Sequence, residues 1–156
     1  MLADVDQLVW HPKLRSLHDY WRSKHAPAGL PRKRDIDPVE IGSLLSNVFL
    51  VSVERDPIRF RYRLIGSAII DVSRANMTGR TMDEAYPGIR EKATYLDYLA
   101  CTEQASVRYY RGHTMFDPDF AFLTTDRILL PVTEDSGAVN FILGGAIHRD
   151  ASGAEI

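Results

Sequence analysis

Histidine and cysteine have the widest chemical reach in this 156-residue sequence, which holds five histidines and one cysteine. His11, His18 and His25 recur every seven residues. On a helix, that spacing places them near one stripe but about 10 Å apart along the axis, too far for one metal ion. We therefore expect a solvated helix flank, with a pH-sensitive dimer face as the alternative, and no metal site.

Three further side chains could take part in chemistry. His113 and His148 lie in strand-like runs, and we favour hydrogen-bonded sheet histidines there over ligands that reach into a cavity. Cys101 is alone, which excludes an intramolecular disulfide and a multi-cysteine metal site. We expect it to be a small core or surface residue in a protein of the reducing cytoplasm.

Catalytic signatures are missing from the sequence. It has no G-x-S-x-G, H-E-x-x-H, Walker A or G-x-G-x-x-G motif. The acidic pairs Asp117/Asp119 and Asp83/Glu84 fall at expected turns and helix starts, where carboxylates bind backbone N–H groups. We predict no catalytic residues and no enzyme.

Three arginines alternate with apolar residues in RFRYRLIG, residues 59–66, as in a strand with one buried face. Arg59, Arg61 and Arg63 would then share the other face. A solvated outer surface is the interpretation we favour. The alternatives are an anion or carboxylate contact through Arg63, or a buried ion pair of Arg63 that ties the strand to a connector.

The first element to position such groups is a helix near the N-terminus. Trp10, Leu14, Leu17 and Trp21 recur at helical spacing and form one apolar stripe. This stripe must cover either the domain's own sheet or a matching helix of a partner. We predict a partner or dimer face there.

Short helices and strands follow. Asp37, Pro38 and Glu40 form a helix start with a capping-box pattern, and 81–84 form another. Ser67 is expected to cap a short helix. A longer helix over residues 89–106 would bury the side that carries Ile89, Ala93, Leu96, Leu99 and Ala100.

Strands are expected on both sides of these helices. VFLVSVER and RFRYRLI form a hairpin around Asp56-Pro57, and three strand-like runs follow residue 106. Pro131 indicates an edge or a bulge, and Gly144-Gly145 indicates a close approach by backbone, side chain or ligand. The order predicts an α+β fold: an antiparallel sheet of five strands with helices gathered on one face.

Length and composition place this fold in one domain. We expect residues 1–36 to form the N-terminal helix and connector, 37–149 the core, and 150–156 a frayed tail. A net charge of −2 gives no general attraction to nucleic acid or to an anionic membrane. No apolar run approaches the ~20 residues of a membrane helix.

Several stretches in this order resemble the bacterial PAS_5 family of PAS domains. The similar stretches are Tyr20-Trp21, Leu30-Pro31-Arg32, Asp35-Ile36-Asp37-Pro38, Leu44-Leu45, Phe60 to Gly66, Met77 to Thr81 and Leu129-Leu130-Pro131. The resemblance as a whole spans roughly residues 14–148.

The resemblance implies a five-stranded antiparallel sheet curved around short helices, with a small-molecule cavity between them. It also implies a sensory or signalling role and a homodimer formed through the N-terminal helix. We expect neither flavin nor haem. The segment 66–81 lacks the cysteine of flavin photosensors, and the helix over residues 89–106 lacks the histidine that haem-binding PAS sensors place there.

The predicted function is a non-catalytic sensory domain that binds a small molecule, a signalling protein partner, or both. The alternatives are a dimerisation or scaffold module with a filled core and a ketosteroid-isomerase-like cone enzyme. That enzyme would need an inward Asp with Tyr or His, and Tyr110 and His113 are expected on opposite faces. The predicted cavity residues are Tyr62, Leu64, Ile70, Met77, Tyr110, Met115, Leu129 and Phe141.

Overall fold

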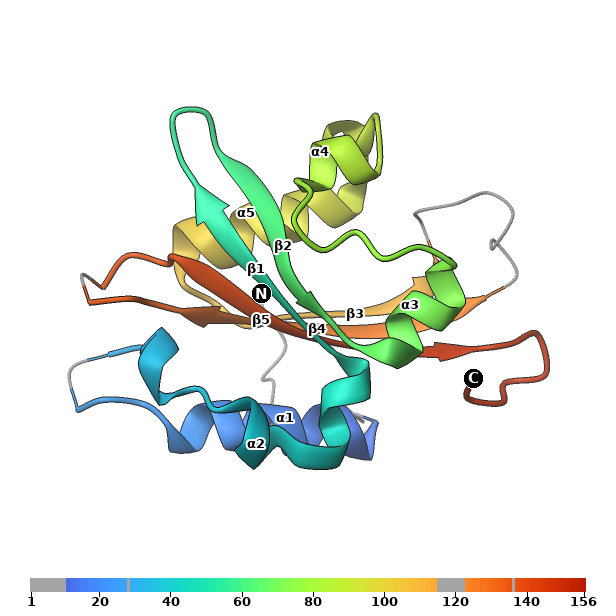
Figure 1. Ribbon diagram of the computed structural model, residues 1–156, viewed down its shortest axis with the longest axis horizontal. Helices are drawn as coiled ribbons and strands as arrows, with labels where there is room; N and C mark the ends of the chain where they lie inside the picture. The colour runs from blue at the N-terminus through green and yellow to red at the C-terminus, as the bar shows by residue number, and fades with distance from the viewer. Residues whose placement is uncertain (1–10, 28, 115–122, 136) are drawn as a thin grey trace.

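A five-stranded antiparallel sheet forms the centre of the computed structural model, which describes residues 11–27, 29–114, 123–135 and 137–156. The strands run in the order β2-β1-β5-β4-β3 across the sheet (Figure 1). Their bounds are β1 Val48–Glu54, β2 Arg59–Ile65, β3 Arg108–His113, β4 Thr124–Val132 and β5 Phe141–Arg149. The predicted α+β fold is confirmed.

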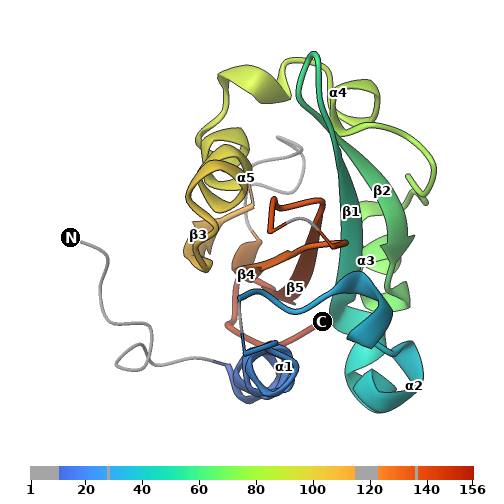
Figure 2. The same cartoon turned by 90° about the vertical axis from the view of Figure 1, so that its left-hand side faces the viewer.

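Helices cover both faces of this sheet (Figure 2). One face carries α3, α4 and α5, and the other carries α1 and α2. The helix bounds are α1 Pro12–Ser23, α2 Pro38–Ile41, α3 Ser67–Ser73, α4 Met82–Ala85 and α5 Ala93–Gln104. The prediction that the helices gather on one face is therefore wrong for α2, which lies beside α1.

The apolar stripe of α1 is part of the domain's own core. Leu14, Leu17 and Trp21 are buried against β4 and β5, and the Trp21 indole N–H donates to the carbonyl of Pro131 at 2.8 Å. The prediction that these three side chains form a partner face is therefore wrong, because they cover the domain's own sheet. The predicted Trp10 lies outside the described residues.

Two adjacent glycines on β5 allow side chains from both faces of the sheet to pack directly against this strand. A Cβ atom on Gly144 would lie 2.0 Å from the Phe49 ring, and one on Gly145 would lie 2.8 Å from Leu14 and 2.9 Å from Leu17. Phe49 is the cross-strand partner of Gly144 on β1. The predicted close approach is confirmed, and side chains make it from opposite faces.

The position of Pro131 also agrees with the sequence. β3 pairs with β4 only as far as Leu129, so residues 130–132 of β4 have no partner on β3. Pro131 lies in this unpaired part and stays in register with Ile142 of β5. A residue without an N–H group is tolerated there because that side of the strand needs no donor.

Helix starts were predicted with mixed success. The capping box of Thr81 and Glu84 is present in full. Asp37 caps α2, but Glu40 forms an ion pair with Lys24 instead of completing a box. Gly66, not Ser67, is the N-cap of α3, so no side chain caps the start of this helix.

The orientation of α5 differs from the prediction. Its buried side carries Tyr95, Tyr98 and Cys101, whereas Leu96 is 61% exposed. Apolar side chains occur all round this helix, so their spacing does not select one face. Tyr98 and Phe60, whose ring centroids lie 5.4 Å apart, hold the helix on the sheet.

The C-terminal segment is attached to the domain and is not the frayed tail that was expected. Glu155 forms a hydrogen bond with His11 at 2.8 Å and an ion pair with Lys13 of α1 at 2.7 Å. The Ile156 N–H donates to the carbonyl of His148 at 3.0 Å. The chain therefore folds back beside the end of β5.

Substitution of Gly144 by alanine tests the contact between β1 and β5. We expect Gly144→Ala to lower the free energy of unfolding by about 1–3 kcal/mol, since the new methyl group overlaps the Phe49 ring. Urea unfolding measures the change. In a Phe49→Leu background the same substitution should cost less, because the ring is gone. An equal cost in both backgrounds would contradict this packing.

Candidate functional site

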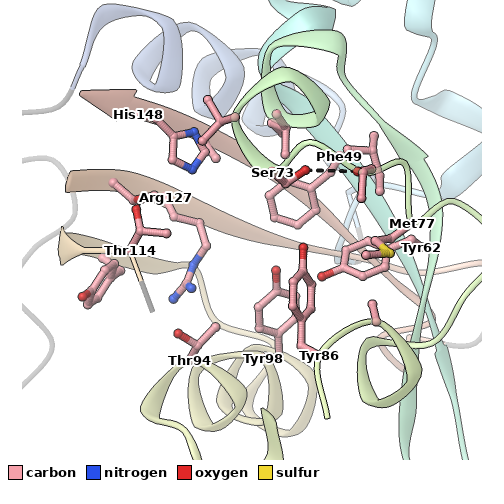
Figure 3. Close-up of a pocket in the computed structure, with 18 of the residues that line it drawn as sticks. Phe49, Tyr62, Ser73, Met77, Tyr86, Thr94, Tyr98, Thr114, Arg127 and His148 are labelled. Carbon is pink, nitrogen blue, oxygen red and sulfur yellow. Dashed lines mark hydrogen bonds between the residues drawn. The ribbon is translucent and has the colours of Figure 1, made fainter. Parts of the chain in front are cut away.

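A cavity of about 360 Å³ lies between the sheet and helices α3, α4 and α5 (Figure 3). Every strand of the sheet contributes to it, because each presents alternate residues to this face. The lining residues are Phe49, Tyr62, Ile65, Ile69, Val72, Ser73, Ala75, Met77, Ala85, Tyr86, Pro87, Thr94, Tyr98, Tyr110, His113, Thr114, Thr125, Arg127, Ala146 and His148.

One end of the cavity is apolar and aromatic. Tyr62 and Met77 lie at this end in Figure 3, with Phe49 and Tyr86 nearby. Burial raises the pKa of the Tyr62 and Tyr98 hydroxyls well above the ordinary tyrosine value, so both are neutral phenols at pH 7. This end suits a flat or branched apolar group.

The opposite end is polar. His148 and Arg127 project from the neighbouring strands β5 and β4, Thr114 follows the end of β3, and Thr94 faces them from α5 (Figure 3). The Thr114 and Thr125 hydroxyls lie 2.6 Å apart and share a hydrogen bond. This end can therefore orient a polar group whose apolar body lies against the aromatic residues.

Among the cavity-lining residues that the structure describes, Arg127 is the only Asp, Glu, Lys or Arg. Its exposure is only 5%. Nη2 donates to Oδ2 of Asp97 at 2.8 Å, and the guanidinium carbon lies 5.1 Å from the Tyr110 ring centroid and 5.6 Å from that of Tyr98. These contacts fix the guanidinium at the polar end.

His148 is buried at the same end. Burial lowers the pKa of its imidazole below 6.5, because the low-dielectric surroundings disfavour the charged form. It is therefore neutral at pH 7 and can both donate and accept a hydrogen bond.

Three of the eight predicted cavity residues line this space: Tyr62, Met77 and Tyr110. Leu129 is on the correct face but packs in the core, and Ile70 is replaced in the lining by its neighbour Ile69. Leu64 and Phe141 pack on the α1 face instead, so their prediction is wrong. Met115 lies outside the described residues.

The prediction that Tyr110 and His113 point to opposite faces is also wrong, because both line the cavity. The Tyr110 hydroxyl folds back over Gly112 and donates to the His113 carbonyl at 2.8 Å. His113 is the last residue of β3, where strand alternation no longer constrains the chain.

Arg63 does not reach the cavity. It is exposed, and its Nε donates to the Ser52 hydroxyl on β1 at 2.9 Å. Arg61 forms an ion pair with Glu54 at 2.6 Å, and Arg59 is exposed. The arginines therefore occupy the outer face of the hairpin. Arg63 does not line the cavity and forms no buried ion pair with the residues that the structure describes.

Arg127 and Tyr98 are the important lining residues that sequence reasoning missed. In TTDRILL the inward positions are Thr125, Arg127 and Leu129, so a charge on the inner face of a buried strand was the available signal. Tyr98 was missed because the wrong side of α5 was taken as buried.

Asp126 points away from the cavity. Its carboxyl group is fully buried on the opposite face of the sheet and forms ion pairs with Arg111 at 2.9 Å and with Arg149 at 3.0 Å. Burial alone would raise the pKa of this carboxyl, but the two arginines outweigh it and lower the pKa below its ordinary value. This cluster ties the strand ends together.

Cys101 is buried in the core, and burial raises the pKa of its thiol to about 12. The reactive thiolate is therefore scarce at neutral pH. Among the residues that the structure describes, no cluster of three His, Cys, Asp or Glu side chains could hold a metal ion. No helix in this part of the chain is long and apolar enough to cross a membrane.

A model of a known protein family matches most of the chain. The PAS_5 family model, described as a PAS domain, matches residues 9–147. No curated protein matches the chain.

The buried His148 predicts a pH dependence of stability. Because its pKa is lowered by folding, the unfolded chain binds a proton near pH 6 that the folded chain does not. The free energy of unfolding should therefore fall as the pH drops from 7.5 through 6.5 toward the folded-state pKa.

Urea unfolding at pH 7.5 and 5.5 measures this fall, which should be smaller in His148→Gln than in the wild type. His113→Gln is the matched control because it removes an exposed histidine of the same cavity. A His148 ring whose NMR titration midpoint lies at or above 6.5 would contradict the assignment.

Proposed function

Because the chain belongs to the PAS_5 family of PAS domains, we propose that it is a sensory domain that binds a small molecule in the cavity between the sheet and α3–α5. The observation that carries this proposal is the cavity itself, with one apolar end and one polar end. Ligand pockets generally combine an apolar lining with a few placed polar groups in this way.

The volume sets the size of the ligand. At about 30 Å³ for each water-sized group, a space of about 360 Å³ accommodates roughly a dozen non-hydrogen atoms. A scaffold module with a filled core has no need of such a space. The proposal therefore favours a metabolite-sized ligand over a purely structural role.

The lining favours binding over catalysis. Among the described residues it includes no Asp or Glu, so a ketosteroid-isomerase-like cone would lack its carboxylate base. Tyr62 and Tyr98 are neutral and held by burial. These residues supply shape and hydrogen bonds, which is what recognition requires.

A route for the signal follows from the glycine pair. Phe49 lines the cavity and lies on Gly144, while Leu14 and Leu17 of α1 lie on Gly145 from the other face. A ligand that displaces the Phe49 ring would press on the strand that supports α1. The proposed output is a change at the exposed side of α1, where a second copy of the chain or a signalling partner would bind.

Methyl NMR tests ligand binding directly. Met77 lines the cavity, whereas Met82 is buried in the adjacent core. In protein labelled at the methionine methyl groups, a library of small amphipathic compounds should contain members that shift Met77 strongly and Met82 weakly.

A blocking variant and a matched control sharpen this test. Ala75→Trp should abolish the Met77 shifts by filling the cavity, and Val39→Trp should leave them unchanged because Val39 is 85% exposed elsewhere. If no compound shifts Met77, or if the Ala75→Trp protein responds like the wild type, the cavity is not the binding site.

A further inference from the structure

We infer that the ligand of this cavity carries an anionic head group of the carboxylate type, which Arg127 binds, and an apolar tail. The inference rests on the proposed ligand-binding function and specifies the chemical class of the ligand.

The first support is an unused donor. The Nε–H of Arg127 is buried from solvent and has no hydrogen-bond partner. The rings of Tyr98 and Tyr110 lie beside the guanidinium, but a contact with a ring face does not satisfy an N–H group that points in the guanidinium plane. A buried donor without an acceptor is costly, so the protein's own contacts leave the guanidinium incompletely paired. An anion at the part of Arg127 that lines the cavity would add charge-assisted contacts.

The second support is local charge. Asp97 is shared, because Oδ2 accepts from Arg127 at 2.8 Å and Oδ1 accepts from Arg108 at 3.0 Å. Two arginines and one carboxylate leave this cluster with a net charge of about +1, and Arg127 is its member that lines the cavity. Asp126 does not cancel that charge, since it lies on the opposite face between Arg111 and Arg149.

The third support is the rest of the lining. Described residues of the cavity wall include no carboxylate that would repel an anion. His148 is neutral and can donate one N–H to the same head group. Thr94 and Thr125 supply hydroxyl groups at this end. A single negative charge would neutralise the guanidinium and gain charge-assisted hydrogen bonds.

The opposite end determines the tail. Phe49, Tyr62 and Met77 offer apolar surface and no charge. The volume permits roughly a dozen non-hydrogen atoms in all, so about nine remain for the tail once a carboxylate is placed. Small aryl-alkyl and medium-chain carboxylic acids meet both requirements.

Matched pairs of acid and amide test this inference, because a carboxylate and a carboxamide share shape and differ in charge. The probes are 4-phenylbutanoate with 4-phenylbutanamide, and three further pairs with cyclohexyl, naphthyl and straight-chain tails. Titrations at pH 7, followed by the Met77 methyl signal, give the Kd of each. For the best tail, the acid should bind at least about tenfold more tightly than the amide.

Variants assign the preference to Arg127. Arg127→Gln should reduce the ratio between acid and amide to about one and change amide affinity less than about threefold. Asp97 keeps Arg108 as its partner in this variant. Arg127→Lys retains the charge and should keep part of the preference. Arg59→Gln, an exposed arginine outside the cavity, is the control and should behave like the wild type.

The outcomes separate the two proposals. Equal affinity for acid and amide in the wild-type protein overturns the anionic ligand and leaves the cavity as a binding site; this comparison needs no variant to fold. A preference that survives in Arg127→Gln overturns the role of Arg127. Failure of every acid and every amide to shift Met77 overturns the ligand-binding function and the inference with it.

Discussion

The absence of side chains at Gly144 and Gly145 is the constraint on which the rest of the structure depends. β5 is the central strand and is covered on both faces, so a methyl group at either position would overlap a neighbour. Phe49 occupies the space on one side, and Leu14 and Leu17 of α1 occupy it on the other. One strand thereby supports both the N-terminal helix and the wall of the cavity.

The cavity keeps its shape because its polar end is built from charges that are already partly satisfied. Arg127 cannot leave its position without abandoning Asp97, and Asp97 is held in turn by Arg108 on β3. The rings of Tyr98 and Tyr110 restrict the guanidinium further. What remains is a buried donor and a surplus positive charge beside an apolar space. That combination is the basis of the proposal that the cavity is a recognition site and not a packing defect.

Local patterns predicted the elements well and the site poorly. Alternation in RFRYRLI placed Tyr62 inward correctly, and the Thr81–Glu84 capping box formed as its residues indicated. The predicted buried side of α5 is wrong because apolar residues occur all round this helix. Tyr98 is therefore absent from the predicted cavity residues. Arg127 was missed since its partner Asp97 lies thirty residues earlier, and a contact between distant segments leaves no local pattern.

A crystal structure of protein purified from cells without denaturation tests the central claim, that the cavity between the sheet and α3–α5 is an anion-selective ligand site, most directly. The account predicts continuous density in the cavity. Its polar end should lie within hydrogen-bond distance of the Arg127 guanidinium, and its apolar body should contact Phe49, Tyr62 and Met77. A cavity closed by its own side chains, or a bound molecule whose head group lies away from Arg127, would contradict it.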